Sequence, residues 1–148
     1  MVSIRKNNRG FTIVELLIVI VVIGILAALV VVTYNGIQQK ARDTERKTDI
    51  NALHGQLEAY QAQNGKYPTL TEVNTPAFRA ANMKGLDPAA LQDPKGDAQT
   101  LEAASDANDY GYAATPANCD NAAGGDCLQY TLTATLEDGT TYTKQSLN

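Results

Sequence analysis

The order of apolar and polar positions sets the first 32 residues apart from the rest of the chain. From Leu16 to Val32 every side chain is apolar or absent. Counted from Phe11 this segment is about 22 residues long, enough for an α-helix to cross a hydrocarbon layer of about 30 Å. One carboxylate, Glu15, lies inside it, and a charge in a membrane is costly unless it has a function. The pattern predicts a membrane-spanning helix over residues 11–32 in which Glu15 has a specific role.

A second helical pattern follows. Apolar side chains recur with steps of three, four and three residues, which is one face of a helix. These positions are Ile50, Leu53, Leu57 and Tyr60. No proline interrupts residues 35–64, and Asn64-Gly65 is a stop signal. We therefore expect one helix from about Phe11 to Asn64, apolar all round in its first half and amphipathic in its second.

Charged side chains of both signs fill much of the surface of the second half of this predicted helix, and we expect them to face solvent. They are Lys40, Arg42, Asp43, Glu45, Arg46, Lys47 and Asp49. We also expect the side chain of His54, on the same helix, to be solvated. Gly24 and Gly36 each lower helix stability by about 1 kcal/mol relative to alanine.

The remainder predicts a connector over 65–108 and an antiparallel sheet over 109–148. In the connector we expect a helix that opens at Pro76 and is capped by Gly85, a helical turn from Asp87 to Leu91, and a β-turn over 93–96. Strands are expected over 110–115, 129–136 and 141–144, with a hairpin turn over 137–140. The fold class is α+β. The expected domains are a basic leader 1–10, the helix 11–32 and a globular domain 33–148.

Charge is distributed unevenly. Three of the 12 basic residues, Arg5, Lys6 and Arg9, precede the apolar segment, whereas the other nine share the rest of the chain with all 16 acidic residues. Cations before an apolar helix favour a cytoplasmic N-terminus, so that the acidic part faces outward. An acidic surface argues against general nucleic-acid binding, which requires neutralisation of phosphates.

The two cysteines, Cys119 and Cys127, are close in sequence, which in an exported domain indicates a disulfide; two free thiols are the alternative. The chain has one histidine and no four-ligand zinc set. Two acidic loops, one with Asp120, Asn121 and Asp126 and one with Asp106, Asn108 and Asp109, offer oxygen ligands for Ca²⁺ but follow no EF-hand pattern, so solvated turns are favoured.

Motifs for catalysis are missing from the sequence: it has no phosphate-binding GxxxxGK loop, no GxSxG, no HExxH and no evident nucleophile with its base. We expect no enzyme activity, no cofactor and no metal.

Residues Arg9 to Leu17 read RGFTIVELL and resemble the class III signal of type IV pilins and the related type II secretion pseudopilins. The resemblance covers residues 5 to about 68 and includes the helix exit Lys66-Tyr67-Pro68-Thr69. It implies that a prepilin peptidase cleaves between Gly10 and Phe11 and N-methylates Phe11. It also implies that Glu15 pairs with the Phe11 ammonium of a neighbouring subunit, which sets the register of a filament. Val32 stands where the family often has a proline.

The resemblance leads to three candidate functions. The main expectation is a structural subunit of a type IV pilus, a helical homo-oligomer for adhesion, twitching motility or DNA uptake. It would span the cytoplasmic (inner) membrane once before assembly and lie in a cell-surface filament after it, with an assembly ATPase and a membrane platform protein as partners. The alternative is a type II secretion pseudopilin. A membrane-anchored tip adhesin or DNA receptor ranks lower, because the cations beyond the helix, Lys66, Arg79, Lys84, Lys95 and Lys144, are spread thinly.

Overall fold

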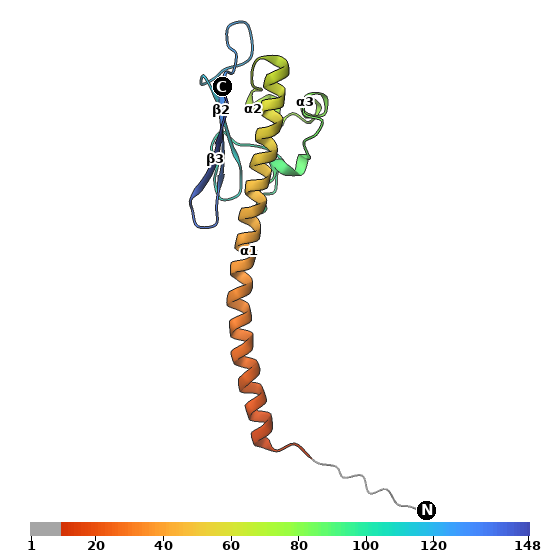
Figure 1. Cartoon of the computed structure of the whole chain (residues 1–148), viewed down its shortest axis with the longest axis vertical. Coiled ribbons are helices and arrows are strands. Elements are labelled where there is room, and N and C mark those ends of the chain that lie inside the picture. The colour runs from red at the N-terminus through yellow and green to blue at the C-terminus, as the bar shows by residue number, and fades with distance from the viewer. Residues whose placement is uncertain (1–9) are drawn as a thin grey trace, which may run out of the picture. The chain divides into compact units, whose positions relative to one another are not determined.

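The computed structural model describes residues 10–148, so the leader residues 1–9, with Arg5, Lys6 and Arg9, lie outside the described part. The chain divides into two compact units, one up to Gln38 and one from Gln39 to Asn148. Figure 1 shows a long helix, shorter helical segments and a small sheet, which confirms the α+β class. The elements are α1 (Ile13–Asn64), α2 (Leu70–Asn74), α3 (Pro76–Asn82), the 3-10 helix η1 (Pro88–Leu91), β1 (Gly111–Thr115), β2 (Gln129–Thr135) and β3 (Thr141–Gln145).

In the first unit, α1 begins at Ile13, two residues later than predicted, and continues through Gly24 and Gly36. Every large apolar side chain from Phe11 to Ile37 is at least 48% exposed. By length and composition this helix is able to cross a membrane. The exposed apolar surface needs lipid or other protein chains to cover it.

The second unit has a core between the C-terminal part of α1 and one face of the sheet. The predicted helix face is confirmed, since Ile50, Leu53 and Leu57 are fully buried. They pack in one cluster with the inward-facing side chains of the strands. Those side chains are Tyr112, Tyr130, Leu132 and Ala134. Burial of this apolar surface is the main force that holds the sheet against the helix.

The sheet is antiparallel, as predicted, and its strand order is β1-β2-β3. Tyr112 pairs with Leu132, and Ala134 pairs with Tyr142. Buried positions alternate along β2, which is the period-two pattern of a strand with one face on the core. The turn between β2 and β3 closes with a bond from the Leu136 N–H to the Thr140 carbonyl, and Gly139 has a φ of 81°. Glycine adopts this left-handed backbone conformation at the lowest cost, because it has no Cβ atom.

The connector differs from the prediction in two places. Helix α2 was not predicted; its N-cap Thr69 and third residue Glu72 form a capping box. The predicted cap of α3 at Gly85 is wrong: α3 ends at Asn82, and its C-cap is Met83. Both other elements are confirmed. Asp87 caps η1 through the Ala89 N–H, and the β-turn closes with the Gly96 N–H on the Asp93 carbonyl at 2.8 Å.

Candidate functional site

The candidate processing site lies just before α1. Gly10 and Phe11 are exposed and outside the helix. A Cβ atom added at Gly10 would meet nothing within 4 Å, so the packing of the described residues places no demand for glycine there. A peptidase requires a segment that is accessible and outside regular secondary structure, as these two residues are.

Glu15 lies in the first turn of α1, where it forms a capping box with Thr12. Its carboxylate accepts hydrogen bonds from the Thr12 N–H at 2.8 Å and the Thr12 hydroxyl at 2.7 Å. The Glu15 N–H in turn donates to the Thr12 hydroxyl at 3.2 Å. This reciprocal bonding explains why the helix begins at Ile13. This role of Thr12 was not predicted, although the pattern Thr-x-x-Glu before an apolar run is a local signal for a capping box.

The capping box gives the Glu15 carboxylate local partners within its own chain. An anion in the first turn also interacts favourably with the helix dipole. These contacts do not neutralise its charge, since Thr12 supplies only neutral donors. A cation from elsewhere is still required for charge balance in an apolar environment.

A buried arginine is the largest correction to the predicted solvated face of the helix. Arg46 is 1% exposed, and its guanidinium binds both oxygens of Asp93 at 2.7 and 3.0 Å. It also binds Asp43 at 3.0 Å and Glu137 at 2.9 Å. The buried arginine is thus paired with carboxylates from its own helix, the connector turn and the β2–β3 turn. Such multiple hydrogen bonding is what makes a buried charge tolerable.

Two more cations join this ion network through Glu137. Arg42 binds the Glu137 carboxylate with two nitrogens, at 2.8 and 3.1 Å, and Lys95 binds it at 2.8 Å. The Arg42 guanidinium, followed by the Lys95 ammonium, holds the pKa of Glu137 far below its ordinary value. Glu137 therefore stays ionised under ordinary conditions and fastens the β2–β3 turn to α1.

His54 is also not a solvated side chain, contrary to prediction. It is half-buried, and its Nδ1 lies 2.6 Å from the Tyr130 hydroxyl oxygen. That hydroxyl is also 2.9 Å from Glu58, and the Tyr67 hydroxyl reaches the same carboxylate at 3.0 Å. The Tyr130 hydroxyl has one proton and can donate it to only one of these two partners, so the tautomer of His54 decides the direction of their contact. The arrangement is a hydrogen-bond network that joins α1 to β2.

Cys119 and Cys127 form a disulfide with their Cα atoms 5.2 Å apart. The loop that it closes has contacts of its own: the Asn121 side chain donates to the Tyr67 carbonyl and accepts from the Cys127 N–H. Lys66 binds Asp126 at 2.9 Å. In residues 10–148 no group of three His, Cys, Asp or Glu side chains is arranged to hold a metal ion.

Comparison with known proteins places this site in a class. Residues 5–31 match the family described as the prokaryotic N-terminal methylation motif, and Gly10, Phe11 and Glu15 lie within this matched segment. The long apolar helix followed by a small sheet, together with this motif, defines a type IV pilin-like protein. No solved structure matches the chain significantly.

Curated relatives identify the family. The chain is 37% identical over 104 residues to the type II secretion system core protein G of Escherichia coli, covering 70% of each chain. It is 38% identical over 91 residues to that of Klebsiella pneumoniae, and 43% identical over 65 residues to that of Dickeya chrysanthemi. The aligned segments cover 62% and 44% of this chain and 63% and 42% of those relatives, less than two thirds of their length. The chain belongs to the type II secretion system core protein G family of pseudopilins.

Proposed function

We propose that this chain is a structural subunit of a type II secretion pseudopilus, a short filament that acts as a piston beneath the cell surface. The observation that carries the proposal is the 37% identity to a core protein G over 70% of both chains. It favours the pseudopilus over the pilus, which the signal segment alone did not separate. In this role the chain performs no catalysis.

Processing and assembly follow from the residues at the start of α1. The prepilin peptidase removes the leader 1–10 by cleavage between Gly10 and Phe11, and the new N-terminus of Phe11 is methylated. Residues 11–32 hold the subunit in the inner membrane until an assembly ATPase and a platform protein add it to the filament. The exposed apolar surface of this segment supports the proposal, because helix-to-helix packing in a filament would cover it.

Glu15 has the central role in assembly. The processed N-terminus is an ammonium group, and the Glu15 carboxylate of a neighbouring subunit is its partner. Because an unpaired buried charge is strongly disfavoured, only the register that forms this pair is stable. The capping box with Thr12 holds the carboxylate at the helix end before the pair forms.

The test starts from the surface-sheared and membrane fractions of cells that produce the wild type, Gly10→Ala or Gly10→Val. N-terminal sequencing and intact mass should show a start at methylated Phe11 for the wild type and for Gly10→Ala. The bulkier Gly10→Val should keep its leader and fail to support protein secretion in a strain that lacks the native gene. Since Gly10 has free space around it, a failure of Gly10→Val reports on processing rather than on folding. A wild-type start at Met1 or after Ala28 contradicts the proposal, and long sheared fibres would favour the pilus.

A further inference from the structure

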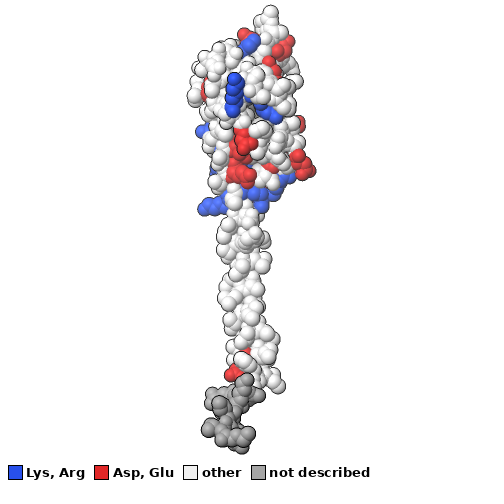
Figure 2. Space-filling model, turned by 90° about the vertical axis from the view of Figure 1, so that its right-hand side faces the viewer, with Lys and Arg blue, Asp and Glu red and all other residues white. Residues whose placement is uncertain are grey.

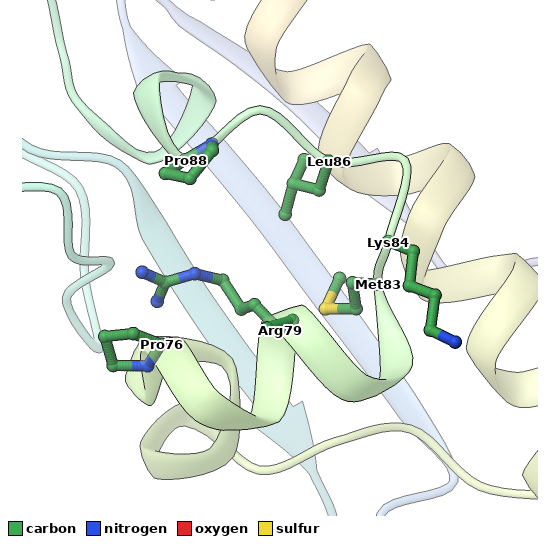
Figure 3. A pocket seen from close by; sticks show the side chains of 7 residues that line it. Pro76, Arg79, Met83, Lys84, Leu86 and Pro88 are labelled. Carbon is green, nitrogen blue, oxygen red and sulfur yellow. The ribbon is translucent and has the colours of Figure 1, made fainter.

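A cavity of about 350 Å³ lies between α3 and the segment that leads to η1 (Figure 3). It combines apolar side chains with two cations. Its lining includes Pro76, Arg79, Met83, Lys84, Leu86 and Pro88. A cavity of this composition suits a ligand with an anionic group on an apolar stem.

Arg79 is the unusual member of this lining. It is 8% exposed, and its Nη1 donates to the Val73 carbonyl at 2.7 Å. Its Nε has no hydrogen-bond partner, and within residues 10–148 it is the one buried side-chain nitrogen or oxygen in that condition. An unsatisfied buried donor costs free energy, and one on a charged group costs more than one on a neutral group. Such a group in a native fold calls for an explanation.

The geometry of the guanidinium shows which ligand would satisfy it. With Nη1 bonded to Val73, the edge formed by Nε and Nη2 is left for another acceptor. This edge carries two parallel N–H groups, which match the two oxygens of a carboxylate. In Figure 3 the guanidinium extends between Pro76 and Pro88, and Lys84 lies at the other end of the cavity. The prolines would contact the methylene groups of an acidic side chain, while Lys84 adds a second, exposed positive charge.

We infer that this cavity is a carboxylate-binding site, and that its occupant in the assembled filament is an acidic side chain of a second copy of this chain. The choice of a second copy rests on the proposed function. Charge complementarity supports it: of 16 acidic and 12 basic residues, one acid and three bases precede residue 39, which leaves 15 acids against 9 bases in the second unit. Each neighbour therefore presents an excess of carboxylates. Solvent does not reach the Nε in the isolated chain, so binding requires that the segment 84–87, which contributes Lys84 and Leu86 to the cavity lining, moves to admit the carboxylate.

The site itself is tested on the unassembled, processed full-length chain in detergent micelles. Sodium 3-methylbutanoate is added at constant ionic strength, with sodium chloride and inorganic phosphate as reference anions, while the arginine Nε–H signals are followed by NMR. The Arg79 signal should shift in a saturable way with the carboxylate. Arg42 and Arg46 serve as internal controls, because their Nε atoms already bind Glu137 and Asp93.

Two variants distinguish the contribution of the Nε–Nη2 edge of Arg79 from the contribution of positive charge alone. Arg79→Lys keeps the cation and loses the edge, so binding, followed on the Ala80 and Leu86 backbone amides, should weaken at least about tenfold. Lys84→Gln removes an exposed charge and should weaken binding about fivefold at most. A wild-type signal that does not saturate, that responds equally to chloride, or that prefers phosphate would overturn the carboxylate site.

The occupant is tested in filaments assembled from equal parts of ¹⁵N-labelled and ¹³C-labelled subunits. A solid-state correlation between Arg79 Nε and a side-chain carboxyl carbon is expected, and it should be lost in Arg79→Lys filaments. Filaments without this correlation overturn the second copy as occupant, even if free carboxylates bind. A chain that forms no filament overturns the proposed function and this occupant together, whereas the titration still decides whether the cavity binds carboxylates.

Discussion

The two ends of α1 place the same kind of side chain in opposite surroundings. Apolar residues up to Ile37 are about half exposed or more, whereas Ile50, Leu53 and Leu57 are fully buried. Figure 2 shows that charged side chains gather on the second unit, and the sequence has a single charged residue, Glu15, between residues 10 and 39. Since apolar surface is stable only where water is excluded, the second unit is stabilised by its own contacts and the first by what surrounds it. Substitutions in the first should therefore affect assembly, and those in the second should affect folding.

The largest effect is expected at Glu15. Glu15→Ala and Glu15→Gln should both insert in the membrane but reduce filament yield at least about tenfold, because the Phe11 ammonium would lose the partner that we propose for it. Pelleted filaments quantified by immunoblot against total membrane-bound subunit measure the yield.

Thr12→Val is the matched control for the capping box. It removes the hydroxyl that binds Glu15 and leaves the charge in place. Near-normal yield is expected for Thr12→Val. Glutamine preserves the capping ability of residue 15, so normal assembly of Glu15→Gln together with failure of Thr12→Val would show that capping, rather than charge, is what matters.

The largest effect on folding is expected at Arg46. Arg46→Met leaves the Asp93 carboxylate buried without its cation and should lower the free energy of unfolding by about 3–5 kcal/mol. Arg42→Met is the control, since this side chain is 28% exposed and its pair with Glu137 should contribute about 1 kcal/mol or less. Urea unfolding in micelles, followed by the near-UV circular dichroism of the tyrosines, measures both. Equal losses for the two variants would contradict the distinction between the buried and the exposed pair.

Arg46 also shows which features of the structure the sequence can predict and which it cannot. It precedes Ile50 by four residues and so falls on the predicted buried face, but two of its three acidic partners, Asp93 and Glu137, are 47 and 91 residues away in the chain. Periodicity predicts which face is buried, and alternation with turn chemistry predicts the three strands. Neither predicts which distant carboxylates meet a given cation. His54 was missed for the same reason, because Tyr130 is 76 residues away.

By contrast, the short-range features that were missed had local signals. The capping boxes Thr12 to Glu15 and Thr69 to Glu72 both follow the Thr-x-x-Glu pattern, and the second of them begins α2. The signal segment indicated the class of protein from sequence alone, because its residues are contiguous in the chain. The cavity at Arg79 is different, since an unbonded nitrogen is visible only once α2, α3 and η1 are in place.

The disulfide should have an intermediate effect. In the chain-entropy description, removal of a cross-link that closes a loop this short costs about 2–3 kcal/mol of unfolding free energy. Double replacement of Cys119 and Cys127 by alanine should show this loss, and reduction of the wild type should produce the same value. The variant should keep its fold, because Asn121 still fastens the loop to the Tyr67 carbonyl. If reduction of the disulfide unfolded the sheet, the contacts of the loop itself would be too weak to hold it, contrary to this expectation.

The smallest expected effect is a pH dependence that belongs to the second unit alone. Burial raises the pKa of Asp49 to about 6, against the opposing hydrogen bond from the Tyr110 hydroxyl, and the nearby charges Glu45, Asp93 and Asp87 raise it further. The folded state thus binds the Asp49 proton more tightly than the unfolded state, whose pKa is near 3.8. The stabilising contribution of protonated Asp49 is complete below about pH 4 and is lost as the pH rises through 6.

Asp49→Asn removes this charge but keeps an oxygen that can accept the Tyr110 hydroxyl, 2.8 Å from the present carboxylate. It should be more stable than the wild type at pH 7.5 by about 1 kcal/mol, a value reduced for partial exposure, and equal to it at pH 4. Thermal unfolding at both pH values measures the difference, with the exposed Asp97→Asn as control. A difference that is the same at pH 4 would mean that the substitution acts through packing. If Asp49→Asn gained less stability over the wild type at pH 7.5 than at pH 4, the pH dependence would have the opposite sign. That result would contradict the desolvation argument, because burial of a carboxylate always disfavours its charged form.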